Sequence, residues 1–149
     1  MIRPASPADQ AAIRTLAGSY REELERAGAP YHGGGNGAWQ AWFGRRMNAG
    51  DVRVALSEGR AVGYAVWEVR RDPAREGREL RITDLFVAPG ERGHRLGGGL
   101  LARALDRARG DGLARIVIDR GLDERAETLL DAFGFAPAGD GFERVLQVR

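Results

Sequence analysis

The segment from Phe86 to Leu105, FVAPGERGHRLGGGLLARAL, constrains the fold of this chain more than any other. It places five glycines, three arginines and one histidine between an apolar run and a run whose apolar residues recur at helical spacing. This change of period predicts a strand, a glycine-rich turn and a helix, in that order. The chain therefore contains a strand-to-helix junction of the kind found in α/β sheets.

The turn in this segment has the composition of an anion site. The first turn of a helix carries unpaired N–H groups and partial positive charge, and glycines let a bulky anion approach the backbone. Arg92 and Arg95 add cationic side chains, so the segment predicts a phosphate or diphosphate site, with a flexible loop of solvated arginines as the alternative. A P-loop is excluded because the chain has no lysine, and the glycine spacing does not match the dinucleotide fingerprint.

Periodicity along the rest of the chain predicts the element order β-α-α-β-β-β-α-β-α-β-β. We expect one domain over residues 1–149, with a mixed sheet covered by helices on both faces. The expected elements are a strand at 2–5, helices at 7–28 and 38–50, a hairpin at 52–69, a strand at 78–89, a helix from about 97 to 110, a strand at 113–121, a helix at 123–135 and a hairpin at 135–149.

The stretch DLFVAPGERGHRLGGGLLARAL resembles motif A of the GNAT superfamily, the acyl-CoA-dependent N-acyltransferases. That motif has a strand ending in V-x-P, then R-x-x-G-x-G, then a helix. Further on, DERAETLLDAFGF (residues 123–135) is similar to the next family motif, N-x-x-A-x-x-L-Y-x-x-x-G-F. The expected element order agrees with the family fold, a mixed and mostly antiparallel sheet that splays between the motif-A strand and the strand after it.

The resemblance implies a pose for acetyl-CoA, the cosubstrate, and no metal. Backbone N–H groups of residues 93–98 would take the diphosphate, and the pantetheine arm would run beside the motif-A strand. The thioester would sit in the splay, where a main-chain N–H near Phe86 or Val87 would stabilise the oxyanion. The implied cofactor-binding residues are Phe86, Val87, Arg92, Gly93, His94, Arg95, Leu96, Gly97 and Gly98.

Three positions depart from the family pattern. Arg95 replaces the first glycine of R-x-x-G-x-G, and its N–H can donate only if its backbone angles suit a non-glycine residue. Leu130 stands where many relatives have a tyrosine that protonates the leaving thiolate, so solvent would serve instead. Thr83 occupies the place of the glutamate that serves some relatives as general base.

Carboxylates near the motif-A strand are the candidates to accept the proton of the attacking amine. Asp84 is the candidate catalytic residue, and a purely structural carboxylate is the alternative for it. We expect Glu68 and Glu79 to be solvated residues at a sheet edge more often than proton acceptors. The loop and helix at 30–43 are expected to wall the acceptor site, with Trp39 either shaping a pocket or packing in the core.

Composition excludes several other classes. The chain has no cysteine and two histidines, so a disulfide, a cysteine nucleophile and a histidine-rich metal site are not expected. The net charge of +2 with interspersed signs does not indicate a nucleic-acid binder. No apolar run is long enough to cross a bilayer and no signal peptide is visible, so we expect a soluble cytoplasmic protein with no membrane partner.

These observations lead to an N-acetyltransferase that passes an acetyl group from acetyl-CoA directly to an amine of a small molecule or peptide. Homodimers are common among relatives, but the sequence does not establish one here. The alternative is an acyl-CoA-binding regulatory or sensor domain with little catalytic activity, and Thr83 and Leu130 are the residues that support it.

Overall fold

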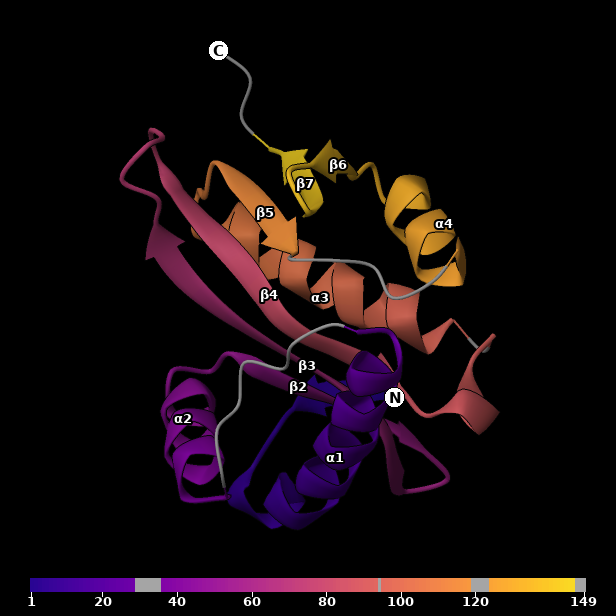
Figure 1. The fold of residues 1–149 in the computed structure, drawn as a ribbon. Coiled ribbons are helices and arrows are strands. Elements are labelled where there is room, and N and C mark those ends of the chain that lie inside the picture. Colours follow the sequence, from indigo (N-terminus) through magenta and orange to yellow (C-terminus); the bar gives the residue numbers. More distant parts are fainter. Residues whose placement is uncertain (29–35, 94, 119–123, 147–149) are drawn as a thin grey trace.

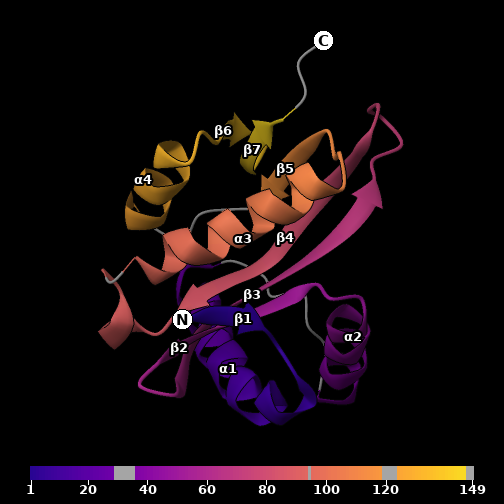
Figure 2. The same cartoon turned by 180° about the vertical axis from the view of Figure 1, so that it is seen from behind.

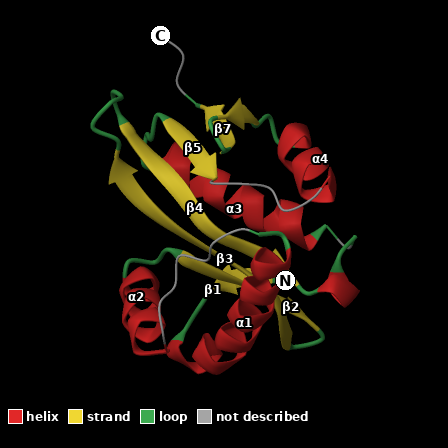
Figure 3. Cartoon of the chain, viewed as in Figure 1, coloured by secondary structure: helices red, strands yellow, loops and turns green. Residues whose placement is uncertain are grey.

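The computed structural model describes residues 1–28, 36–93, 95–118 and 124–146. In these ranges the order of helices and strands is the expected one (Figures 1 and 3). The elements are β1 (Ile2–Pro4), α1 (Gln10–Arg26), α2 (Asn36–Asn48), β2 (Val52–Ser57), β3 (Arg60–Arg71), β4 (Arg78–Val87), α3 (Leu96–Gly110), β5 (Arg115–Ile118), α4 (Glu124–Ala132), β6 (Ala136–Ala138) and β7 (Gly141–Val145), with short 3₁₀ turns at Pro7–Asp9 and Pro89–Glu91. None of the helices in these ranges is long and apolar enough to span a bilayer.

The seven strands form one sheet in the order β1-β2-β3-β4-β5-β7-β6. Every neighbouring pair is antiparallel except β4 and β5, which are parallel and are joined through α3. The two parallel strands pair only from Glu79 opposite Arg115 to Ile82 opposite Ile118. Beyond Ile82, β4 continues to Val87, whereas β5 ends at Ile118. This confirms the mixed, mostly antiparallel sheet and the splay after the motif-A strand.

A β-bulge at Thr83 changes which side chains of β4 face which layer. Val66 of β3 lies opposite Asp84, and the next residue of β3, Trp67, lies opposite Ile82, so Thr83 is the extra residue. Its hydroxyl donates to the Val66 carbonyl at 3.2 Å. Before the bulge, Ile82 packs in the core beneath α3, and after it Phe86 packs on the side of α1.

Helices cover the two faces of the sheet with separate apolar cores. One core lies against α1 and α2 and includes Ile13, Phe43 and Tyr64, and the other lies against α3 and includes Leu80 and Leu100. Figures 1 and 2 show α1 and α2 on one side of the sheet and α3 on the other. The helices α1 and α3 each present the apolar stripe that a 3.6-residue period predicts, and burial of that stripe is what fixes them to the sheet.

Trp39 is 6% exposed and stacks on Phe43 with ring centroids 4.7 Å apart. Of the two expectations for this residue, packing in the core is therefore the correct one. The sequence predicts a loop at 29–37 before it. Residues 29–35, with His32, lie outside the described residues, as does His94, whereas Asn36 and Gly37 belong to α2.

Candidate functional site

The turn between β4 and α3 presents backbone amides at the start of the helix. Gly93 has φ of +90° and Arg95 has φ of +64°, and α3 begins directly after them, at Leu96. The Gly99 N–H donates to the Arg95 carbonyl at 3.0 Å, the first bond of the helical pattern that follows. Arg95, the residue before the helix, makes no side-chain cap, so the amides of the first turn remain directed at the space before it.

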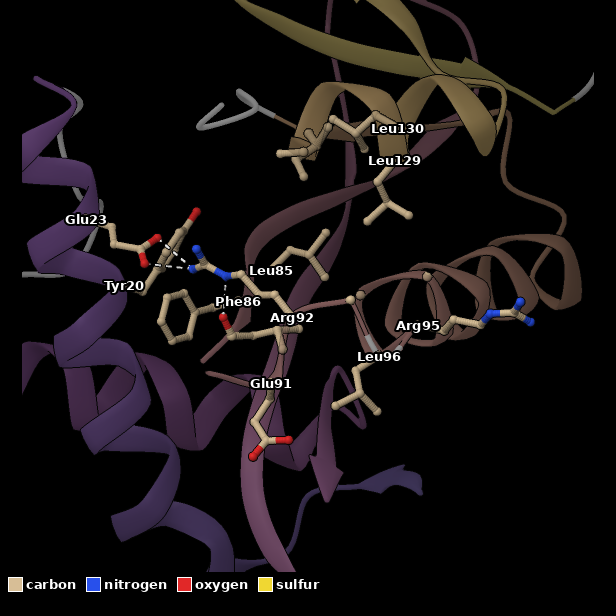
Figure 4. A pocket seen from close by; sticks show the side chains of 16 residues that line it. Tyr20, Glu23, Leu85, Phe86, Glu91, Arg92, Arg95, Leu96, Leu129 and Leu130 are labelled. Atoms are coloured by element: carbon tan, nitrogen blue, oxygen red, sulfur yellow. Dashed lines mark hydrogen bonds and ion pairs between the residues drawn. The ribbon is translucent and has the colours of Figure 1, made fainter. Parts of the chain in front are cut away.

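A cavity of about 360 Å³ opens beside this turn, between α1, the end of β4, α3 and α4 (Figure 4). Of the nine residues that the resemblance implies for the cofactor, eight line this cavity; His94 lies outside the described residues. These eight are Phe86, Val87, Arg92, Gly93, Arg95, Leu96, Gly97 and Gly98. Apolar side chains of Leu85, Ile118, Ala126, Leu129 and Leu130 form much of the remaining wall.

The splayed end of β4 exposes the peptide groups of Val87 rather than those of Phe86. The Ala88 N–H donates to Val62 of β3 at 2.8 Å, and a Cβ on Gly63 of β3 would lie 2.9 Å from the Phe86 carbonyl oxygen. Because N–H and C=O groups alternate sides along a strand, the peptide groups of Val87 point away from β3. The Val87 carbonyl accepts a hydrogen bond from Arg92 Nε at 2.8 Å on that side.

The Arg92 guanidinium is engaged by the protein itself. Its Nη2 donates to both carboxylate oxygens of Glu23 on α1, at 2.7 and 2.9 Å, and its Cζ lies 5.5 Å from the centroid of the Phe86 ring. Both partners of the ion pair are mostly buried. Arg92 therefore connects α1 to the end of β4, and its Nε and Nη2 are engaged by the protein itself.

Arg95 has the opposite character. It is exposed, its side chain has no hydrogen bond or ion pair in the described ranges, and Figure 4 shows it pointing away from the Glu23–Arg92 pair. Its positive φ costs a non-glycine residue about 1 kcal/mol. The backbone angle that the family supplies with glycine is thus reached here by an arginine.

Glycines at the start of α3 also permit its close packing. A Cβ on Gly97 would meet Leu129 of α4 at 3.1 Å, and one on Gly98 would meet Phe133, the residue after α4, at 3.3 Å. On Gly99 it would lie 2.5 Å from Ile2 of β1. The glycine run therefore serves the contact between α3, α4 and β1 as well as the approach of a ligand.

The three candidate carboxylates lie in different surroundings. Asp84 is 0% exposed and accepts a hydrogen bond from the Tyr64 hydroxyl at 2.6 Å, and it is not among the residues that line the cavity. Glu68 is partly exposed and forms ion pairs with Arg46 and Arg81. The expectation of a solvated edge residue is wrong for Glu79, which is 1% exposed because two strands flank it. The role of Asp84 as proton acceptor stays a prediction.

Two residues of α1 that line the cavity were missed by sequence reasoning. Tyr20 and Glu23 of α1 face it, three residues apart and hence on the same side of the helix. Tyr20 packs on Phe86 with ring centroids 5.6 Å apart. Their helical spacing was visible in the sequence, but nothing in the sequence indicated that α1 packs against the end of β4.

Leu130 is 2% exposed and lines the cavity, at the place of the family's tyrosine. An aliphatic side chain at this position cannot donate a proton. The departure noted in the sequence therefore lies at the wall of the cavity.

Comparison with known families and proteins gives a consistent result. The sequence model described as "Acetyltransferase (GNAT) family" matches residues 12–135. A curated relative, mycothiol acetyltransferase of Brachybacterium faecium, is 33% identical over 101 residues. That alignment covers 67% of this chain but 29% of the relative, so the chain spans less than a third of the curated protein.

Solved structures share the fold over nearly the whole chain. An N-acetyltransferase from Staphylococcus aureus Mu50 superposes with a TM-score of 0.78 at 22% identity, covering 99% of this chain and 98% of that one. A ribosomal-protein-alanine N-acetyltransferase from Brucella melitensis gives 0.74 at 23% identity, with 98% and 99% covered. An acetyltransferase from Clostridium acetobutylicum, solved with acetyl-CoA, gives 0.72 at 17% identity, with 93% and 90% covered.

Proposed function

Because this chain belongs to the GNAT acetyltransferase family, we propose that it transfers an acetyl group from acetyl-CoA directly to an amine of a small molecule or peptide. The observation that carries the proposal is that eight motif residues line the same cavity, from the end of β4 to the start of α3. The backbone amides at the start of α3 suit a diphosphate. The splayed end of β4 extends from these amides toward the apolar side chains that line the cavity. We further propose that residues 1–149 act as one catalytic domain.

Each part of the cavity has a separate role in this proposal. Backbone N–H groups of the turn and of Leu96, Gly97 and Gly98 bind the diphosphate, and the pantetheine arm lies along β4 beyond the bulge. Acetyl-CoA supplies an acyl group activated as a thioester. The Val87 N–H lies on the side of the gap and is the donor we assign to the oxyanion.

The transfer needs no covalent enzyme intermediate, which agrees with a chain that has no cysteine. The lone pair of a neutral amine attacks the carbonyl carbon, a C–N bond forms and the C–S bond breaks with its electrons on sulfur. One proton passes from the nitrogen to Asp84, the predicted acceptor, directly or through water. The thiolate departs and takes a proton from solvent, because Leu130 provides none. A thiol with a pKa of about 8.5 is an adequate leaving group at neutral pH without that help.

Binding of acetyl-CoA is tested first by thermal unfolding. At a hundredfold excess over Kd the ligand adds about 2.7 kcal/mol to the free energy of unfolding, which raises Tm by about 5–10 °C in a chain of this size. Gly97→Glu should abolish this rise, because the new carboxylate repels the diphosphate while the 3.1 Å contact of its Cβ is with the movable end of Leu129. Gly110→Glu adds the same side chain to open space at the far end of α3 and should leave the rise unchanged.

Transfer is tested by the release of free thiol from acetyl-CoA in the presence of amines. Polyamines, amino acids, aminoglycosides and peptide N-termini form the panel. Thiol release with at least one of these classes supports the enzyme. A Tm rise without thiol release for any of them would instead support the sensor domain, and the absence of both would exclude the two functions together.

A further inference from the structure

A second cavity of about 360 Å³ lies between β3, β4, β5 and the β6–β7 hairpin. Glu79 and Val117 line it from the sheet face opposite α3, since they alternate with Leu80 and Ile116 of the core beneath that helix. Ile118, the last residue of β5, lines both this cavity and the cofactor cavity. The two cavities therefore adjoin at the point where β4 and β5 separate.

Glu79 is the buried polar group of this second cavity. Its Oε2 accepts a hydrogen bond from Arg70 Nε at 2.9 Å, whereas its Oε1, which is enclosed, accepts none. Arg115 Nε is 3.7 Å from Oε1, too far for a hydrogen bond, and the terminal nitrogens of Arg115 donate to the Glu76 carbonyl. A buried carboxylate oxygen without a hydrogen-bond donor is costly. Because the oxygen is enclosed, a ligand in the cavity would offset this cost through its positive charge rather than through a direct hydrogen bond to Oε1.

The charge of the lining favours a cationic ligand. Its four carboxylates exceed its two guanidiniums, although the chain as a whole carries a net charge of +2. One guanidinium, Arg75, is paired with Glu143, and the other, Arg70, with Glu79. Asp72 and Asp140 at the rim form no ion pair in the described part of the chain, so their charge is available to a ligand.

The strand register gives the length of such a ligand. Ile82 and Ile118 form the last pair between β4 and β5, and Glu79 and Arg115 form the pair three residues earlier. At about 3.3 Å per residue, Glu79 lies about 10 Å along the strand from the splay. Resting on the proposed function, we infer that the acceptor is a linear diamine: one nitrogen is acetylated at the splay, and the other, as an ammonium, binds near Glu79, Asp72 and Asp140.

A matched pair of acceptors tests the inference. 1,8-Diaminooctane has two nitrogens that can lie about 10 Å apart, and octylamine has the same chain with one nitrogen. We expect kcat/KM for the diamine to exceed that for octylamine by about tenfold, as one partly desolvated ion pair allows. Equal values would overturn the inference while leaving the acetyltransferase intact.

Variants of Asp72 and Asp140, at the rim of the second cavity, identify the charges responsible for the preference for the diamine. Asp72→Asn combined with Asp140→Asn should raise KM for the diamine about fivefold and leave octylamine within twofold, because only the second ammonium loses its partners. Asp106→Asn, an exposed position on α3 outside both cavities, is the control and should change neither. Glu79→Gln should reduce the preference for the diamine further, and the rim variant decides the question if Glu79→Gln does not fold.

A binding measurement separates this inference from the proposed function. Without acetyl-CoA, the diamine should raise Tm more than octylamine does, and the rim variant should remove the difference. That result would support the cavity even if no amine released thiol and the transfer reaction were wrong. No difference between the two amines in Tm or kcat/KM would refute the cavity whether or not acetyl transfer occurs.

Discussion

The hydrogen bond from Tyr64 to Asp84 allows the structural and catalytic roles of Asp84 to be separated. Both side chains are 0% exposed and their oxygens are 2.6 Å apart. Tyr64→Phe removes only the hydroxyl, since the ring keeps its contact with Phe86 at 6.5 Å between centroids. Removing one partner of a buried hydrogen bond costs about 1–3 kcal/mol, so Tm should fall by about 2–12 °C.

The assay is thermal and urea unfolding of the wild type, Tyr64→Phe and Asp84→Asn, followed by thiol release well below each Tm. If Asp84 is structural, both variants lose stability and the folded fraction of each keeps a kcat within a few-fold of wild type. If Asp84 accepts the proton, Asp84→Asn lowers kcat by about a hundredfold or more while Tyr64→Phe does not. A Tyr64→Phe protein that unfolds within 0.5 °C of wild type would refute the reasoning about the buried bond.

Three further results are expected. Hydrogen bonding to Arg3 lowers the pKa of Asp9 to about 2. This carboxylate therefore adds about 2 kcal/mol to the free energy of unfolding, which is present above pH 4 and lost as the pH falls through 2. Asp9→Asn should remove that part of the acid dependence of urea unfolding. Glu23→Gln should lower stability by about 1 kcal/mol and raise KM for acetyl-CoA, whereas Glu25→Gln on the exposed side of α1 should do neither in kinetic and urea measurements. Arg95→Gly should raise the free energy of unfolding by about 0.5 kcal/mol, since relief of the positive φ exceeds the entropy that glycine adds to the unfolded chain, and a loss of stability would contradict this.

Local patterns in the sequence predicted the order of the elements because helix and strand periods are properties of short segments. The turn before α3 was predictable for the same reason. The faces of β4 were not, since the extra residue at Thr83 reverses the alternation after it and no local signal marks a bulge. Asp84 and Phe86 therefore lie against α1, on the face opposite Ile82.

Contacts between segments that are distant in the sequence could not be predicted from it either. Glu23 and Arg92 are 69 residues apart, and their pairing depends on how α1 packs against the end of β4. The burial of Glu79 arises from Arg70 and Arg115 on the two neighbouring strands, so a residue that resembles a solvated glutamate in sequence is enclosed in the sheet. Both features concern the candidate site more than the fold.

The arginine that bridges α1 and β4 has a thermodynamic consequence. One guanidinium contacts the Glu23 carboxylate on the helix and the Val87 carbonyl on the strand, so displacement at either end is felt at the other. Linkage requires such an influence to be reciprocal. If occupancy of the cavity strengthens this bridge, a second molecule that binds to α1 and alters the bridge will change the affinity for acetyl-CoA by some factor. Acetyl-CoA will then change the affinity for that second molecule by the same factor. The affinities of this protein for two substrates would then be coupled through a single side chain.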